Sequence, residues 1–237
     1  MNCKNCNTEI NQNYCPQCGR PAKLHRIDGH YIQHEIEHLL HFERGFLYTI
    51  KELFLRPGQS IKHFIDEDRN RLVKPIVFVI VCSLINTFVT KIFDIEVGFI
   101  HIDTKLTAMG AIFNWLENHY GYANLFYGIF MAGYAKFLFK KYKYNFFEIL
   151  ILMCYVLGMQ MLIITFFLAI AFATKIELMP FALVIMMVYN VWSISQFFDK
   201  TKIMNYIKAL TSHLAGFITA NVLLGLVGVL IEQIKKP

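Results

Sequence analysis

The chain has 237 residues, of which 56% are apolar and 17% are charged, and its formal net charge is +6 at pH 7. A water-soluble domain rarely combines so much apolar content with so few charges, so the composition indicates membrane spans. A positive charge is also typical of nucleic-acid binding, but here Lys and Arg gather at the ends of apolar segments, where they suit anionic lipid headgroups. We therefore expect the lipid bilayer, and not nucleic acid, as a partner.

Two Cys-x2-Cys pairs open the chain, Cys3 with Cys6 and Cys15 with Cys18. No signal-peptide pattern accompanies them, so we expect a cytosolic N-terminus, where reduced thiols bind metal and do not form disulfides. This spacing is typical of a zinc ribbon, predicted over residues 1–22, in which four thiolates hold one zinc ion. A four-thiolate site has no open ligand position and is structural. The ribbon then either docks a protein partner or caps the membrane domain.

A polar to amphipathic segment on the cytosolic side is predicted over residues 27–73. Its first helix, from about Gly29 to Glu43, carries apolar residues on one face. At 100° per residue, four histidines fall within about 80° of one another on the opposite face. These histidines are His30, His34, His38 and His41. The apolar face is expected on the membrane surface or the bundle, with the histidines toward the cytosol.

Part of this helix matches the H-E-x-x-H pattern through His34, Glu35 and His38. In metalloproteases the two histidines hold zinc and the glutamate activates water. No third ligand stands out; the nearest candidates are Glu52, Asp66, Glu67 and Asp68. Because the segment is rich in histidine, a chance match is easy. We favour a solvated face, and a second metal site at His34 and His38, a pH-sensitive stripe and catalysis by Glu35 remain as alternatives.

Further along, helices are expected from Phe46 to Leu55 and from Ser60 to about Glu67, separated by a break at Arg56-Pro57-Gly58. Hydropathy then predicts a membrane domain over residues 74–237. Its five expected spans cover about residues 75–92, 120–139, 149–174, 178–198 and 213–231. An amphipathic helix that includes Leu106 and Leu116 is expected on the far membrane surface.

The charges between the spans predict the topology. Lys and Arg are concentrated before span 1, between spans 2 and 3 and between spans 4 and 5, and they are sparse in the other loops. Cytosolic loops are the ones rich in Lys and Arg, so this alternation fits an odd number of spans. We therefore predict an all-α integral membrane protein, with a five-span helical bundle, a small zinc ribbon and amphipathic interfacial helices. Its N-terminus is expected in the cytosol and its C-terminus outside.

The polar residues inside the spans are neutral, and we expect them to join helices across the bundle. They are Asn86, Asn124, Gln160, Asn190, Gln196 and Asn221. A proton-coupled transporter usually needs an ionisable residue near the membrane midplane, and no acid or base lies in the middle of a predicted span. This pattern argues against such a transporter. A channel or a lipid-handling protein stays open.

The runs Arg44 to Thr49 and Leu53 to Gly58, followed by Ile61, Arg69, Arg71 and Lys74-Pro75, carry a resemblance. With the ribbon, they resemble a bacterial membrane family of uncharacterised function that pairs a zinc ribbon with a multi-span domain, over about residues 1–90. The layout is also similar to the five-span Yip family of membrane-trafficking proteins. The first resemblance implies an inner-membrane location with a cytosolic ribbon, and the second implies a helical bundle that acts through partners. Neither implies catalytic residues.

These observations favour a non-enzymatic scaffold or adaptor of the bacterial inner membrane, with zinc as its metal and a cytosolic protein as the partner recruited by the ribbon. Two alternatives stay open. One is a membrane-associated metallohydrolase that uses His34, Glu35 and His38. The other is a small channel or lipid-handling protein that uses the bundle interior.

Overall fold

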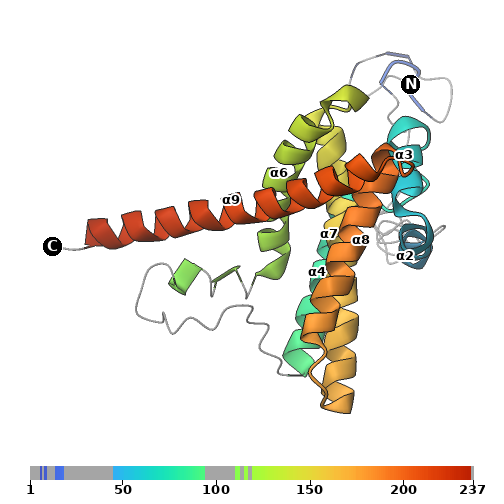
Figure 1. Ribbon diagram of the computed structural model, residues 1–237. Helices are drawn as coiled ribbons and strands as arrows, with labels where there is room; N and C mark the ends of the chain where they lie inside the picture. Colours follow the sequence, from blue (N-terminus) through green and yellow to red (C-terminus); the bar gives the residue numbers. More distant parts are fainter. Residues whose placement is uncertain are drawn as a thin grey trace. The chain divides into compact units, whose positions relative to one another are not determined.

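The computed structural model describes residues 6, 8, 9, 14–18, 45–93, 110–112, 115, 116 and 119–235, and Figure 1 shows its ribbon. The chain divides into two compact units, Met1–Glu43 and Arg44–Pro237. In the first unit, Glu9 and Tyr14 are isolated β-bridge positions. The expected helix from Gly29 to Glu43 and most of the expected amphipathic helix before span 2 lie outside the described residues.

The second unit is built from helices throughout its described part. They are α2 (Phe46–Leu55), α3 (Pro57–Asp66), α4 (Pro75–Ile92), α6 (Tyr120–Leu138), the short 3-10 turn η2 (Lys140–Tyr142), α7 (Phe146–Thr174), α8 (Met179–Phe198) and α9 (Ile203–Lys235). Local signals set several of their starts. A proline lies in the first turn of α3, α4 and α8, where its fixed φ suits the helix. A reciprocal capping box of Asn145 and Glu148 starts α7.

Four helices are long and apolar enough to cross a membrane, namely α4, α7, α8 and α9. They coincide with four of the five expected spans and are consistent with a multi-pass membrane protein. The remaining expected span coincides with α6, which is a 19-residue helix. Several tyrosines, Asn124 and Lys136 make α6 less apolar than the others. The fifth span stays a prediction.

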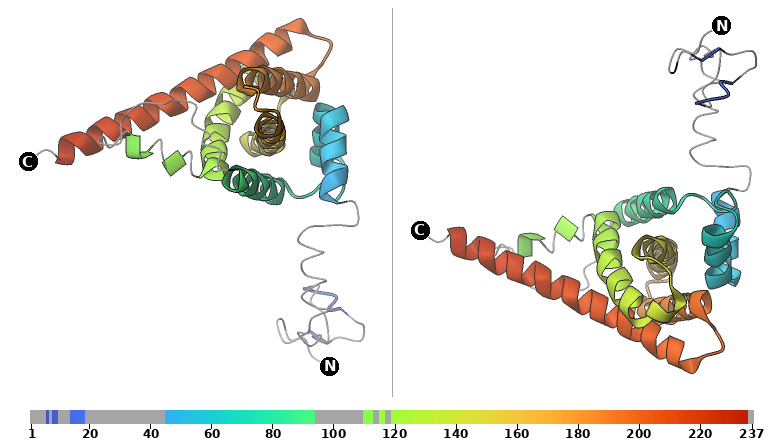
Figure 2. Two further views of the ribbon diagram at one scale, coloured as in Figure 1. Left: turned by 90° about the horizontal axis from the view of Figure 1, so that it is seen from below. Right: turned by 90° about the horizontal axis from the view of Figure 1, so that it is seen from above.

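Helix α7 forms the centre of the bundle, with α4, α6 and α8 packed against it (Figure 2). Its buried side chains run from Ile149 to Leu168. An apolar helix without a polar face is expected where protein surrounds it on most sides. The approach of α4 is close, because a Cβ added to Gly158 would lie 2.6 Å from Cε1 of Phe78. The Phe78 ring also packs 5.7 Å from that of Tyr155, and both side chains are fully buried.

The break between α2 and α3 occurs where the sequence predicts it, but the expected start of the second helix at Ser60 is wrong. Helix α3 begins at Pro57, because proline is favoured in the first turn, where its missing N–H costs nothing. Its first turn packs on the last turn of α8. The N–H of Gly58 donates a 2.8 Å hydrogen bond to Oε1 of Gln196. A Cβ at Gly58 would lie 2.2 Å from the backbone nitrogen of Phe197, so a glycine is required for this contact.

One end of the bundle brings together the end of α3, the end of α6, the start of α7 and the end of α8. The rings of Phe139 and Phe198 stack with centroids 3.9 Å apart. The Tyr144 hydroxyl donates a 3.1 Å hydrogen bond to Asp66. We call this the basic end, defined by Lys136, Lys140, Lys141, Lys143, Lys200, Lys202 and Lys208. The lysines in and beside the α6–α7 connection and those in and beside the α8–α9 connection therefore lie at the same end of the bundle.

Helix α9 begins at Ile203, ten residues before the expected start of span 5 at 213. It passes close to α6, because a Cβ at Gly216 would lie 2.7 Å from the Cα of Met131. In Figures 1 and 2, α9 crosses the direction of α7 and α8 and continues beyond them. Close packing at a small residue allows this steep crossing.

Neutral polar side chains join the helices in pairs, as expected from the sequence. The pairs are Asn86 with Thr165 at 2.8 Å, Asn190 with Gln160 at 2.7 Å and Tyr127 with Asn221 at 3.2 Å. They link α4 to α7, α8 to α7 and α6 to α9. Because a buried amide without a partner is costly in an apolar setting, such pairs fix the register between neighbouring helices.

Candidate functional site

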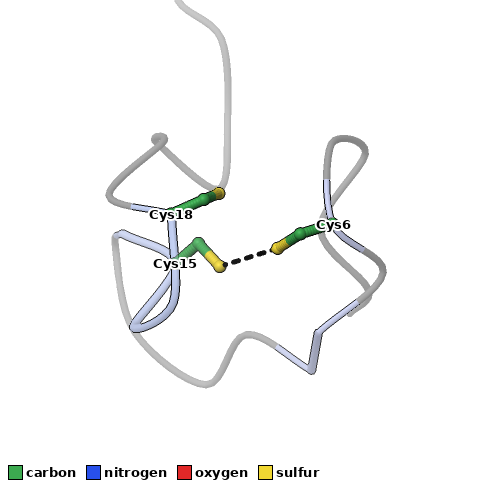
Figure 3. Close-up of side chains that lie close together, drawn as sticks. All are labelled: Cys6, Cys15 and Cys18. Carbon is green, nitrogen blue, oxygen red and sulfur yellow. Dashed lines mark hydrogen bonds between the residues drawn. The ribbon is translucent and has the colours of Figure 1, made fainter.

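Three cysteines of the first unit converge, as Figure 3 shows. The Sγ atoms of Cys6, Cys15 and Cys18 all lie within 4.8 Å of one another. Cys6 comes from the first Cys-x2-Cys pair and the other two from the second. The Cys6 and Cys15 sulfurs are 3.5 Å apart, well beyond the about 2.05 Å of a disulfide. Cys3, the fourth expected ligand, lies outside the described residues.

These distances fit thiols that share one metal ion. Four thiolates bound at about 2.3 Å around a tetrahedral zinc lie about 3.8 Å from one another. A turn over Pro16 to Cys18 returns the second pair toward the first, and Cys15 is buried between them. The described thiols can therefore hold a metal ion, with zinc as the expected one.

Hydrogen bonds around the sulfurs already favour a thiolate at Cys6. The side chain and backbone of Thr8 lower the pKa of Cys6 from 9.0 to about 6. For Cys15 the backbone N–H of Cys18 lowers the pKa, but burial and the neighbouring thiols outweigh this effect and raise it to about 11. The Thr8 hydroxyl donates its proton to Oε1 of Gln17, which ties the two knuckles together. A divalent cation would stabilise the thiolate form of every ligand.

The H-E-x-x-H segment, with His34, Glu35 and His38, lies outside the described residues and stays a prediction. The four carboxylates considered as its third ligand all have partners within the second unit. Asp66 accepts from Tyr144, Glu67 pairs with His63 at 2.7 Å, and Asp68 accepts from the N–H of Asn70. The fourth, Glu52, is the most strongly held.

Glu52 lies at the centre of a buried ionic cluster that we call the Glu52 cluster, formed with Arg56, Ser60 and Arg71. One carboxylate oxygen accepts from Arg56 at 3.2 Å, and the other accepts from Arg71 at 3.2 Å and from Ser60 at 3.0 Å. Glu52 is 4% exposed. A buried carboxylate is tolerated when cations and hydroxyls satisfy its oxygens, so the cluster ties α2, α3 and the segment before α4 together.

The electrostatics follow from these contacts. Burial raises the pKa of Glu52, but the hydrogen bond from Ser60 and the contacts with Arg56 and Arg71 outweigh it, so that the pKa is lowered overall. For Arg71, burial lowers the pKa, while Tyr48 and Glu52 raise it overall. Both groups are therefore charged at neutral pH.

Sequence reasoning placed Glu52 on a cytosolic amphipathic helix and missed its burial. A readable signal was present, because Glu52 and Arg56 have the i,i+4 spacing with the acid first. The pairing with Arg71 depends on the return of the chain after α3, which periodicity within one helix does not show. The polar residue Thr49 is buried beside it and accepts a 3.0 Å hydrogen bond from the N–H of Val73.

Comparison with protein families gives a match to part of the chain. Residues 43–87 match the family described as "Protein of unknown function (DUF3667)". The match contains α2, α3 and the first part of α4, and thus the whole Glu52 cluster. It fits the expected likeness to a family of uncharacterised function, whereas likeness to the Yip family stays a prediction. No curated protein and no solved structure is detectably similar to the chain.

Proposed function

We propose that the chain is a non-enzymatic scaffold or adaptor of the bacterial inner membrane, which recruits a cytosolic protein through an N-terminal zinc ribbon. The observation that carries the proposal is the convergence of Cys6, Cys15 and Cys18 in a unit separate from the helical bundle. With Cys3 as the fourth ligand, zinc would have no open position for a substrate. A closed zinc site stabilises a small module, and small modules of this kind present surfaces to partners.

The proposed topology has five spans, a cytosolic N-terminus and an external C-terminus. Its support is the basic end, where Lys208 of α9 donates to the Leu138 carbonyl of α6 and Phe139 stacks on Phe198, so that the two lysine-rich connections lie at the same end. The opposite end of α7 and α8 has Lys175 and Glu177 between the helices. The positive-inside rule then assigns the basic end to the cytosol. The ribbon comes before the first proposed span, which starts at Pro75, and would therefore face the cytosol as well.

A pull-down from solubilised membranes tests the recruitment. The intact tagged chain is compared with a chain that lacks residues 1–22 and with a variant in which Cys3, Cys6, Cys15 and Cys18 are all replaced by Ser. The matched control replaces the two bundle cysteines, Cys82→Ala and Cys154→Ala.

We expect one set of cytosolic proteins to be captured by the intact chain and by the control, and to be lost from both ribbon variants. The proposal fails if the chain without its ribbon captures the same proteins as the intact chain.

A further inference from the structure

Helix α2 differs from a helix on the surface of a soluble domain, because it buries polar side chains and exposes large apolar ones. Its buried face holds Thr49 and Glu52 together with Leu53. Its exposed face holds Leu47 and Phe54, with exposed fractions of 76% and 63%. These side chains follow helical spacing at i and i+7, and Lys51 and Leu55 share the same exposed face.

Helix α3 has the opposite arrangement. Its exposed residues are Gln59, Lys62 and Asp66, again at helical spacing, and its buried residues include Ile61 and Phe64. This is the ordinary pattern of a helix between an apolar core and water. Two adjacent helices of equal length therefore present surfaces suited to different solvents. We attribute this difference between the exposed surfaces of α2 and α3 to their positions along the bundle.

The contacts with α8 give those positions. The first turn of α3 meets the last turn of α8, through Gly58 and Gln196. Helix α2 meets α8 nine residues before its end, where the Tyr189 hydroxyl donates a 3.0 Å hydrogen bond to the carbonyl of Leu53. At 1.5 Å per residue, this contact is about 14 Å from the end of α8, close to half the thickness of a hydrocarbon core of about 30 Å. Figures 1 and 2 show α2 lying across α7 and α8 and not alongside them.

We propose that α2 is embedded in the cytosolic leaflet, with Leu47, Phe54 and Leu55 in contact with lipid acyl chains. Its depth beside α8 would place this face in hydrocarbon, while α3 would remain at the aqueous boundary. Helix α2 also adjoins α4, because the ring of Phe46 packs 5.4 Å from the buried ring of Phe78.

Helix α4 carries its own exposed apolar stripe, made up of Ile76, Ile80, Leu84, Phe88 and Ile92. Helix α2 thus adjoins a helix whose own outer surface suits lipid.

The charges of α2 fit the same position. Glu52 is turned away from the exposed face and is satisfied inside the protein by Arg56, Ser60 and Arg71. Arg56 is 54% exposed and Lys51 is exposed, and their long side chains can carry the charges from the acyl region toward the headgroups. A helix with apolar side chains toward the acyl region and flanking cations is typical of interfacial insertion, and anionic headgroups would attract those cations. The occupant of this surface is therefore lipid.

Tryptophan quenching tests the insertion in the full-length protein. In a background with Trp115→Phe and Trp192→Phe, single tryptophans are introduced by Phe54→Trp and, independently, by Leu47→Trp. The proteins are reconstituted in phosphatidylcholine and phosphatidylglycerol vesicles, with or without acyl-chain bromination of the phosphatidylcholine. Lys62→Trp on α3 is the matched aqueous control, and Leu84→Trp on α4 reports whether the bundle itself is inserted.

We expect the Phe54→Trp and Leu47→Trp variants to lose fluorescence in brominated vesicles to the extent seen for Leu84→Trp, and Lys62→Trp to lose little and to respond to aqueous iodide instead. The inference is overturned if both α2 variants behave as Lys62→Trp while Leu84→Trp is quenched. It rests on the membrane placement in the proposed function but not on the recruited partner. If Leu84→Trp is not quenched either, the membrane placement and this inference fail together.

Discussion

The hydroxyl of Tyr189, in the middle of α8, donates a 3.0 Å hydrogen bond to the backbone carbonyl of Leu53 in the last turn of α2. Carbonyls in the last turn of a helix have no partner within the helix, so this contact satisfies one of them. Both residues are buried. The bond joins the segment that precedes the first span to a span more than 100 residues later, and it holds α2 at its depth along the bundle.

Removal of this hydroxyl tests how strongly α2 is held. Tyr189→Phe keeps the ring and leaves the Leu53 carbonyl unpaired, so we expect the free energy of unfolding to fall by about 1–3 kcal/mol. Unfolding is followed by circular dichroism in mixed micelles of increasing SDS content. The control is Tyr206→Phe, whose exposed hydroxyl contacts the carbonyl of Lys200 at 3.3 Å and whose loss is expected to cost less than about 0.5 kcal/mol. Equal effects of the two changes would contradict a structural role for the α2–α8 contact.

The Glu52 cluster predicts a larger effect. Glu52→Gln removes the charge that Arg56 and Arg71 face. Loss of one partner of a fully buried ion pair costs about 3–5 kcal/mol, and because both arginines are partly exposed we expect about 2–3 kcal/mol. The same SDS titration measures it. Glu67→Gln is the matched control, since Glu67 is 66% exposed and its pair with His63 is expected to contribute less than about 1 kcal/mol.

If Glu52→Gln unfolds at the same SDS content as Glu67→Gln, the Glu52 cluster does not stabilise the fold.

The stability of the protein should depend on pH through Glu52. Its pKa is lowered in the folded protein, so the charged carboxylate stabilises the fold at pH values above the unfolded-state pKa of about 4.3. This contribution is lost as the pH falls from there through the folded-state pKa. The difference in unfolding free energy between the wild type and Glu52→Gln is therefore expected to be largest near neutral pH and to shrink in acid. If this difference in unfolding free energy grows as the pH falls, the pKa of Glu52 is not lowered by folding.

Hydropathy predicted most of the bundle, because lipid and protein interiors both require long apolar helices. The expected first span, 75–92, coincides with α4, and 178–198 differs from α8 by one residue. Helix α7 starts three residues before the expected 149, since hydropathy does not detect the capping box of Asn145 and Glu148. The N-x-x-E pattern there was readable. The crossing of α9 over α6 depends on packing at Gly216, which no periodicity predicts.

The candidate site was predictable in part. Cys-x2-Cys spacing indicated the thiol cluster, and the structure brings Cys6, Cys15 and Cys18 together. The Glu52 cluster was not predicted, because the sequence shows neither that Glu52 is buried nor that Arg71 returns to α2. Helical periodicity identifies an apolar face but not the solvent that this face meets, and in a membrane it can be the outer face. Only the position of α2 beside Tyr189 distinguishes the two cases.

Close packing at Gly58 gives a test of the α3–α8 contact. Gly58→Ala places a Cβ 2.2 Å from the backbone nitrogen of Phe197, so the helices must separate, and we expect a loss of about 1–3 kcal/mol in unfolding free energy. Gly133→Ala on α6 is the control. A Cβ there meets no atom within 4 Å, and alanine is the better helix former, so the change is expected to be neutral or to stabilise by up to about 1 kcal/mol. Similar losses for both would show that α3 does not pack against α8 as described.

The metal content of the purified full-length protein tests the central claim most directly. Elemental analysis counts the zinc ions per chain in the wild type and in the variant with Cys3, Cys6, Cys15 and Cys18 replaced by Ser. Because the convergence of Cys6, Cys15 and Cys18 fits one ion, we predict about one zinc per chain, lost in the variant. About two, with one surviving the cysteine changes, would instead indicate ligands at His34 and His38 and favour a metallohydrolase. No bound metal in the wild type would contradict a zinc ribbon and the recruitment role proposed for it.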